Sequence, residues 1–162
     1  MMDFSTSGSL RHVLQRYPTG VTVVTSLYGG FPAGGTMNSF VSVSLNPELV
    51  SVSIVSAAKT AAAISETGKF NVNLLAADQT EVAIRFSSGD PEGRFEGGKY
   101  KAGRNGLPVL DGAFGVIECD LFKKVELADH TMFVGKVTDS YIVNGGPPLV
   151  YYGRNFLSLQ LQ

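Results

Sequence analysis

A short segment between residues 35 and 49 groups side chains that suit the binding of a flat ring with polar edges. Thr36, Asn38 and Ser39 place a hydroxyl, an amide and a second hydroxyl around the aromatic Phe40, ahead of an alternating apolar and serine pattern. Asn38 and Ser39 interrupt that pattern, which predicts that backbone N–H groups become free there and need an acceptor. An ordinary edge strand whose serines face water fits the same residues, so the pattern alone leaves both interpretations open.

The stretch 56–60, Ser-Ala-Ala-Lys-Thr, opens an expected helix and could bind phosphate. The N-terminus of a helix presents free N–H groups and positive potential, and Ser56, Lys59 and Thr60 would add two hydroxyls and a charge. A capped amphipathic helix with a solvated lysine is the alternative. Arg85, near the end of a second expected helix, could clamp a phosphate bidentately or compensate the dipole of its own helix.

The pair Asp129-His130 lies between two expected strands, where a histidine beside an acid suits a functional role. No serine or cysteine nucleophile accompanies it in a recognised arrangement, so the sequence does not favour a catalytic triad. Cys119 falls among apolar neighbours in an expected strand and is predicted to be a core residue. No Gly-x-Gly-x-x-Gly follows a strand, so any nicotinamide cofactor must bind otherwise than in a Rossmann site.

The composition favours one soluble domain spanning residues 1–162 and excludes several functional classes. A formal net charge of -1 with no cluster of lysine and arginine argues against nucleic-acid binding. No apolar run approaches the roughly 20 residues needed to cross a bilayer, and the first residues lack the features of a signal peptide. A single cysteine predicts a reducing, cytoplasmic compartment. With one cysteine and two histidines, we expect no metal site.

Periodicity predicts a mainly β chain with a few short helices. Strands are expected at 20–27, 41–44, 49–55, 69–75, 113–127, 131–143, 149–152 and 156–161, and those at 41–44, 49–55 and 69–75 are expected to bury one face. Helices are expected at 10–17, 56–66 and 78–86, the last from a capping box that begins at Asp78. Residues 87–112, rich in glycine, proline and charge, are predicted to form a long surface loop. Because strands and helices do not alternate, we predict an antiparallel barrel with helices packed outside it.

Taken in order, several motifs resemble the flavin reductase family, the small NAD(P)H:flavin oxidoreductases that supply reduced flavin to two-component monooxygenases. The similar segments cover nearly the whole chain: 17–25 as the opening strand, 35–47 as the ring-binding segment, 69–75 as the middle strand, then 106–110, 118–119, 129–131, 133–137 and 148–154. Two positions depart from the family pattern. Asn46-Pro47-Glu48 replaces an Asp-Pro-Pro turn, and Ala128, where a glycine is usual, could alter the loop that places His130.

The resemblance implies a split antiparallel β-barrel that binds FAD or FMN at the interface of a homodimer. The residues implied to hold the flavin are Thr36, Met37, Asn38, Ser39 and Phe40 along the ring, Ser53, Ile54 and Val55 beneath the ring and ribityl chain, Ser56, Lys59, Thr60 and Arg85 at the phosphate with Phe86 beside them, and Tyr152 and Arg154 near the mouth of the site. His130, with Asp129, is implied to meet the nicotinamide.

The implied reaction is hydride transfer from NADH or NADPH to the flavin, which a separate oxygenase then uses. No arginine pair marks a 2′-phosphate site, which favours NADH. Three alternatives stay open: a flavoredoxin-like electron carrier that does not reduce free flavin, a pyridoxamine-phosphate oxidase type of enzyme on a similar barrel, and a flavin-free structural domain. Residues 87–112 are a candidate gate over the nicotinamide. The sequence does not separate FAD from FMN, or a permanently bound flavin from a transient one.

Overall fold

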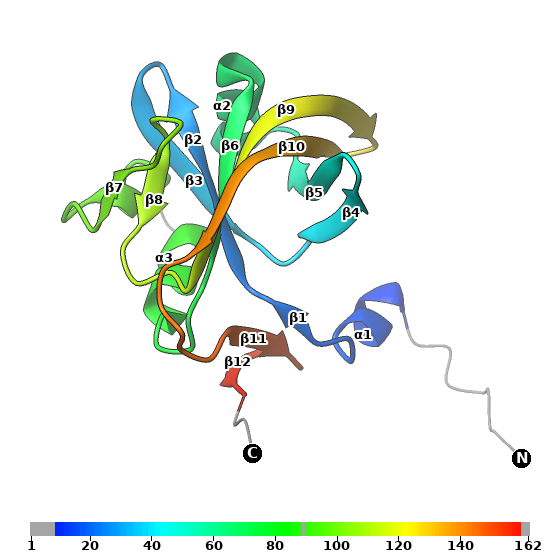
Figure 1. The fold of residues 1–162 in the computed structure, drawn as a ribbon. Helices are drawn as coiled ribbons and strands as arrows, with labels where there is room; N and C mark the ends of the chain where they lie inside the picture. The colour runs from blue at the N-terminus through cyan, green and yellow to red at the C-terminus, as the bar shows by residue number, and fades with distance from the viewer. Residues whose placement is uncertain (1–8, 89, 160–162) are drawn as a thin grey trace, which may run out of the picture.

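The computed structural model describes residues 9–88 and 90–159 and consists mainly of β-strands (Figure 1). The strands are β1 (Thr19–Gly20), β2 (Thr22–Tyr28), β3 (Phe31–Met37), β4 (Val41–Leu45), β5 (Glu48–Val55), β6 (Lys69–Leu74), β7 (Tyr100–Ala102), β8 (Pro108–Leu110), β9 (Gly115–Leu127), β10 (His130–Ile142), β11 (Leu149–Tyr152) and β12 (Asn155–Ser158). The helices are α1 (Leu10–Leu14), α2 (Lys59–Thr67), α3 (Thr80–Ser87) and the 3-10 helix η1 (Gly93–Phe95). The mainly β composition with few, short helices is as predicted.

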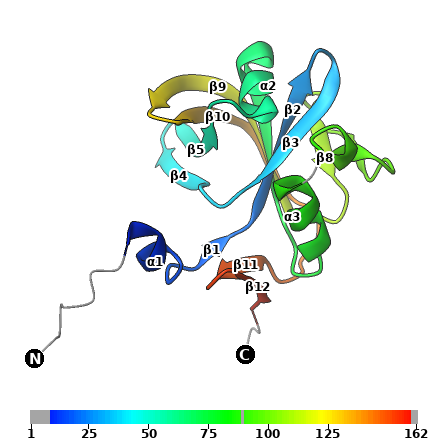
Figure 2. The ribbon, with the colours of Figure 1, turned by 180° about the vertical axis from the view of Figure 1, so that it is seen from behind.

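Seven antiparallel strands form one sheet in the order β3-β2-β6-β9-β10-β5-β4, which Figures 1 and 2 show curved into an open barrel. Its end strands, β3 and β4, do not pair with each other within the described ranges, so the barrel is split between them. Ser39 holds the chain at this opening, because its Oγ donates to the Ser53 carbonyl of β5 (2.9 Å) and accepts the Ser53 N–H (3.1 Å). The prediction of a split antiparallel barrel is confirmed.

Two apolar clusters hold the elements together. The first fills the space between the curved sheet and α2 and contains Val24, Val50, Val52, Ile54, Ala61, Ile64, Phe70, Val72, Cys119 and Phe133. The second lies under α3 and contains Val21, Val23, Leu75, Ala83, Phe86, Leu110 and Leu149. Phe86 also meets Phe95 edge-on, with ring centroids 5.0 Å apart. The second cluster therefore ties α3 and η1 to the base of β2.

Cys119 is a fully buried free thiol in the first cluster, as predicted. Burial, with smaller contributions from the charges of Asp120 and Glu118, raises its pKa to about 12. Only the thiolate is nucleophilic, so the folded protein is expected to resist alkylation at about pH 8, near the ordinary thiol pKa. Reaction with iodoacetamide, followed by mass spectrometry, should label Cys119 only after denaturant is added. Rapid labelling of the native protein would contradict this burial.

Strand β3 is not predicted by the alternation rule, because Pro32, Gly34 and Gly35 all disfavour strands. The structure shows what the two glycines do. A Cβ at Gly34 would lie 2.9 Å from the Val24 carbonyl oxygen, too close for any side chain. Gly35 points to the other side, where a Cβ would lie 3.4 Å from Thr60 Oγ1. One glycine permits close packing of β3 on β2, and the other leaves space beside α2.

The segment 87–112 is not the continuous surface loop that its composition predicts. It contains η1 and the β7–β8 hairpin, and Leu107, Val109 and Leu110 in it are buried. The buried carboxylate of Glu118 in β9 accepts the backbone N–H groups of Arg104 (2.9 Å) and Asn105 (2.8 Å), which fixes the turn of this hairpin. The prediction of a continuous loop was wrong because Glu118, which anchors the hairpin, lies outside the segment. The composition of residues 87–112 contains no information about it.

Burial also differs from the predicted one-sided pattern in two strands. In β4 the expected buried face is uncovered, with Val41 and Val43 54% and 52% exposed. In β6 both faces are buried, because Asn71 and Asn73 point into the protein beside the apolar residues. Asn73 Nδ2 donates to the Val23 carbonyl at 2.9 Å, so its amide is satisfied there.

The helices start or stop a few residues away from their predicted bounds. Helix α1 ends at Leu14, α2 begins only at Lys59, and α3 begins at Thr80 without a capping box. Gln79 takes the place expected of Asp78, but its side chain accepts the Ala76 N–H and donates to the Asp111 carbonyl instead of capping the helix. The strand predicted at 156–161 extends beyond the described residues. No described helix is long and apolar enough to span a membrane.

Candidate functional site

A cleft of about 440 Å³ opens between β3, the start of α2, the end of α3 and the β9–β10 turn. We call it the β3–α2 cleft. It is lined by Gly35, Thr36, Met37, Asn38, Ser39, Ser53, Ile54, Val55, Ala58, Thr60, Phe86, Ser87, Arg94 and His130. The split in the barrel creates this space, because the chain leaves β3 at Met37 and does not rejoin the sheet until Val41. The cleft therefore brings together elements that are far apart in sequence.

The wall of the cleft at Asn38 and Ser39 has backbone donors that the protein does not use. Among the described residues, the N–H groups of Asn38, Ser39 and Phe40 donate no hydrogen bond, since the chain has left one strand and not yet entered the next. Such groups need an acceptor or water. This matches the prediction that donors become free here, and it leaves them available to the polar edge of a flat ligand.

The hydroxyls near these donors are largely engaged within the protein. Thr36 Oγ1 donates to the Ala83 carbonyl of α3 (2.6 Å), and Ser39 Oγ is held by the backbone of Ser53. Ser56 Oγ lies 2.9 Å from Thr131 Oγ1, which joins the approach to α2 to strand β10. These side chains therefore fix the walls of the cleft, and the backbone is left as the main source of donors.

One end of the cleft is positively charged. The Arg94 guanidinium donates through Nη1 to the Gly34 carbonyl (2.8 Å), while its Nε is buried without a hydrogen-bond partner in the described chain. Desolvation lowers the pKa of Arg94, and the charge of Asp90 opposes that shift. Thr60, 2% exposed, lies across Gly35 from this guanidinium. A partly desolvated guanidinium beside a hydroxyl suits an anion such as phosphate.

His130 lines the cleft as the first residue of β10, where it is in register with Val55 of β5. Its Nδ1 lies 2.8 Å from Asp129 Oδ1, and the hydrogen bond and charge of His130 lower the pKa of Asp129. Ala128, in the turn just before them, has a φ of 53°, a conformation that glycine adopts more readily. The turn thus fixes the imidazole through Nδ1, and Nε2 is left for a ligand.

The cleft gathers ten of the residues predicted to form the site: Thr36, Met37, Asn38, Ser39, Ser53, Ile54, Val55, Thr60, Phe86 and His130. Phe40 does not line this cleft; it lines a neighbouring hollow of about 510 Å³, which Asn38 and Ser39 also line. Arg85 is exposed and lines a neighbouring cleft with Asp78 and Asp111, which Arg94 also lines. Arg94, not Arg85, is therefore the arginine that the structure brings to the β3–α2 cleft.

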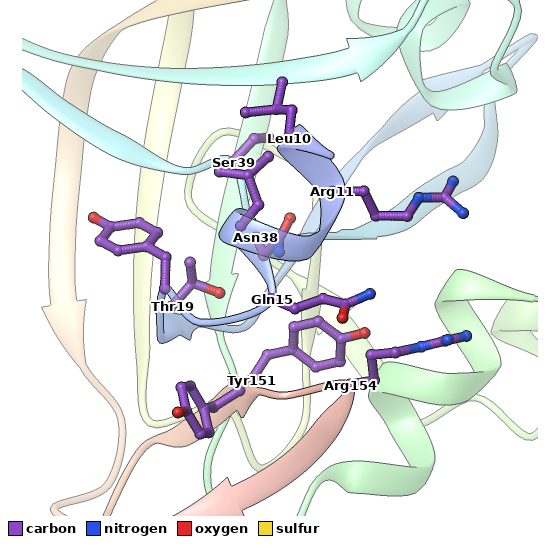
Figure 3. A pocket seen from close by; sticks show the side chains of 11 residues that line it. Leu10, Arg11, Gln15, Thr19, Asn38, Ser39, Tyr151 and Arg154 are labelled. Atoms are coloured by element: carbon purple, nitrogen blue, oxygen red, sulfur yellow. The ribbon is translucent and has the colours of Figure 1, made fainter. Parts of the chain in front are cut away.

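Tyr152 and Arg154 line a separate groove of about 780 Å³ between α1 and β11. Asn38 and Ser39 line both this groove and the β3–α2 cleft, so the two spaces share one wall. Figure 3 shows Arg11 and Arg154 extending toward the same side of the groove, from opposite ends of the chain. The structure thus brings together two arginines that no sequence motif pairs. The argument that the chain lacks an arginine pair for the 2′-phosphate of NADPH, which favoured NADH, is therefore weaker.

Comparison with known proteins agrees with this geometry. Residues 14–160 match the model of the flavin reductase like domain. This chain belongs to the flavin reductase family. The chain is 37% identical over 153 residues to the actinorhodin polyketide dimerase of Streptomyces coelicolor. That match covers 94% of this chain and 86% of that protein.

Two further comparisons concern a reductase subunit and a solved structure. The chain is 33% identical over 150 residues to the flavin-dependent monooxygenase reductase subunit HsaB of Rhodococcus jostii, covering 93% of this chain and 76% of that protein. The solved NADH:FAD oxidoreductase SgcE6 of Streptomyces globisporus C-1027 superposes with a TM-score of 0.88 at 32% identity, covering 99% of this chain and 98% of that one. The split-barrel fold of this flavin reductase family member is thus also that of a solved relative.

Four residues that line the cleft of this flavin reductase family member were not among the predicted site residues: Gly35, Ala58, Ser87 and Arg94. Arg94 lies in 87–112, which its composition assigns to the surface. The one local signal was Phe95, an aromatic residue in a polar segment, which packs between Phe86 and Tyr100 and so anchors Arg94 at the cleft. No group of three or more His, Cys, Asp or Glu in the described part of the chain is placed to hold a metal ion.

Proposed function

We propose that this chain is an NAD(P)H:flavin oxidoreductase that reduces FAD or FMN with NADH. The observation that carries the proposal is the β3–α2 cleft, with unused backbone donors at Asn38 and Ser39 and the desolvated Arg94 at one end. A flavin ring has acceptors along one edge, and its ribityl chain ends in a phosphate. The two features of the cleft therefore fit the two polar parts of a flavin, and membership of the flavin reductase family supports the same activity.

The residues present divide the work of holding a flavin. The backbone N–H groups at Asn38 and Ser39 would bind the polar edge of the ring, and β5 at Ser53–Val55 would lie under the ring and ribityl chain. Arg94 and Thr60 would bind the phosphate. When bound, the flavin supplies the redox chemistry by taking up the hydride of the nicotinamide. The protein contributes orientation and electrostatics, since no side chain in the cleft has to donate or remove a proton for this transfer.

Purified protein mixed with NADH or NADPH, with and without excess FAD or FMN, tests the proposal. The expected result is a loss of NADH absorbance that requires added flavin. Flavin binding without NADH consumption would reject the reductase and favour the flavoredoxin-like electron carrier. If the protein neither binds flavin nor consumes NADH, a flavin site in the β3–α2 cleft is rejected. Comparing the four combinations also ranks the two flavins and the two nicotinamide nucleotides.

His130→Ala is expected to raise the KM for NADH about three- to tenfold, which corresponds to the loss of one hydrogen bond of about 0.5–1.5 kcal/mol. Flavin affinity is expected to change less than twofold. The reason is that Nδ1 is held by Asp129, so Nε2 is the atom left to position the nicotinamide. Steady-state kinetics with NADH and separate flavin titrations measure the two effects. Unchanged NADH affinity and hydride-transfer rate would end this assignment. Asp129→Asn, which keeps the imidazole, serves as the milder comparison.

We also propose that the protein forms a homodimer. The proposal is supported by α1, whose apolar residues Leu10, Val13 and Leu14 are 73%, 59% and 55% exposed, and by the uncovered face of β4. Figures 1 and 2 show α1 standing away from the barrel beside β1. Exposed apolar clusters of this kind mark association surfaces, and a second copy would cover them.

Light scattering on the purified protein is expected to give twice the chain mass of 17.2 kDa. The double variant Leu10→Glu/Leu14→Glu should shift the mass toward one chain, because charges replace the apolar face of α1. Phe31→Glu, at an exposed apolar site that begins β3, is the matched control and should leave the mass unchanged. A wild-type mass of one chain would reject the homodimer.

We further propose that the protein acts as one domain over residues 1–162 and passes reduced flavin to a separate oxygenase, of the aromatic hydroxylase type. Its similarity to a monooxygenase reductase subunit supports the oxygenase partner. A cytoplasmic location is supported by the free thiol of Cys119 and by the use of NADH as reductant.

A further inference from the structure

Lys59 lies beside the charged end of the β3–α2 cleft in the chain, and a carboxylate already partly engages its charge. It lies between Ala58 and Thr60, which both line the cleft, and its side chain is 30% exposed. Its Nζ lies 3.4 Å from Glu92 Oε1 and 5.9 Å from the centroid of the Tyr28 ring. A carboxylate therefore pairs with an ammonium group whose chain neighbours, Ala58 and Thr60, line the cleft where Arg94 and Thr60 would bind phosphate.

The segment that carries Glu92 also carries Arg94, and the two residues are held very differently. Arg94 is anchored by the Gly34 carbonyl, whereas the Glu92 side chain is 79% exposed and touches Lys59 alone among the charged groups described. The backbone N–H of Glu92 donates to Asp90 Oδ1 (3.0 Å), which sets the direction of the chain but leaves its carboxylate free to turn away. The segment thus carries one fixed cation that lines the cleft and, two residues earlier, one displaceable anion.

We propose that Glu92 competes with the phosphate of a bound flavin for Lys59 and so limits how long the flavin stays bound. The inference rests on the proposed flavin site. An exposed ion pair is weak, so a phosphate group displaces Glu92 readily, yet each binding event must break the pair. The carboxylate thereby lowers the affinity for phosphate-bearing flavins by about two- to fivefold. This property favours a flavin that leaves as a product over one held permanently.

Dissociation constants of riboflavin, FMN and FAD, measured by fluorescence quenching at low salt, test the proposal with Glu92→Gln, Lys59→Gln and the double variant. Glu92→Gln is expected to tighten FMN and FAD two- to fivefold and to leave riboflavin, which lacks the phosphate, unchanged. Lys59→Gln is expected to weaken FMN and FAD about three- to tenfold. In the Lys59→Gln background, Glu92→Gln should have no further effect, because the competed-for charge is gone.

The exposed pair Lys124–Glu126, with an N–O distance of 3.5 Å, is a matched control on β9. Lys124→Gln and Glu126→Gln should change none of the three affinities more than twofold. The proposal is overturned if Glu92→Gln weakens FMN, tightens riboflavin equally, or tightens FMN to the same extent without Lys59. These outcomes differ from a failure of the proposed function, in which the wild-type protein would bind none of the three flavins.

Discussion

Gly35→Val is expected to weaken flavin binding at least about a hundredfold, or ~2.7 kcal/mol, while the protein stays folded. The Cβ of any residue here would lie 3.1 Å from Met37 Cε, 3.4 Å from Thr60 Oγ1 and 3.7 Å from Arg94 Nη1. A valine side chain would therefore fill the charged end of the cleft, against side-chain ends that can move slightly. Valine also suits a strand, so β3 should keep its pairing with β2. Flavin titration and thermal unfolding measure the two effects.

The neighbouring glycine supplies the contrast, because successive residues of a strand face opposite sides. Gly34→Ala would place a Cβ 2.9 Å from the Val24 carbonyl oxygen and 3.2 Å from Phe95. It is expected to cost about 1–3 kcal/mol of stability by overpacking. Gly20→Ala, where no atom lies within 4 Å, should change neither property. Normal flavin binding by a folded Gly35→Val protein would show that the ligand does not occupy this cleft.

The parts of the fold that sequence predicts well are those whose signals are local. Strands β9 and β10 show long apolar alternation and were predicted to within two residues, and Gly68 ends α2 in the left-handed conformation expected of a helix stop. The segment 36–39 was recognised because its polar residues interrupt a pattern. In each case a few consecutive residues contain the whole signal.

The parts that sequence predicts poorly depend on distant partners. Gly34 and Gly35 gave no strand signal, because the contacts that explain them, with Val24 and with the cleft, come from distant residues. The hairpin within 87–112 is fixed by Glu118, and the valines of β4 lie on a strand face that the described residues leave exposed. The same reason explains why the sequence pointed to the wrong arginine for this cleft. Arg85 has neighbouring hydroxyls in sequence, whereas Arg94 reaches the cleft only through the packing of Phe95.

Substitutions of Arg94 and Arg85 are expected to have different effects on FMN binding. The comparison tests whether the phosphate binds at Arg94, in the β3–α2 cleft, or at Arg85, near the end of α3. Arg94→Gln is expected to weaken FMN about 10- to 100-fold, since hydrogen bonds to a charged group contribute about 1.5–3 kcal/mol. Riboflavin affinity should change little, because riboflavin has no phosphate. Arg85→Gln should leave both affinities unchanged, as Arg85 is exposed in the neighbouring cleft beside Asp78 and Asp111. Titrations of both flavins with both variants measure these differences.

Arg94→Lys tests whether charge alone is enough. Lysine keeps the charge but lacks the planar set of donors that allows one guanidinium to bind the Gly34 carbonyl and a phosphate together. It should therefore recover only part of the lost FMN affinity. Thermal unfolding provides the control, because the hydrogen bond to Gly34 is lost in Arg94→Gln whether or not a ligand binds. Equal losses for FMN and riboflavin would mean that Arg94 only supports the wall of the cleft, and a loss confined to Arg85→Gln would return the phosphate to the end of α3.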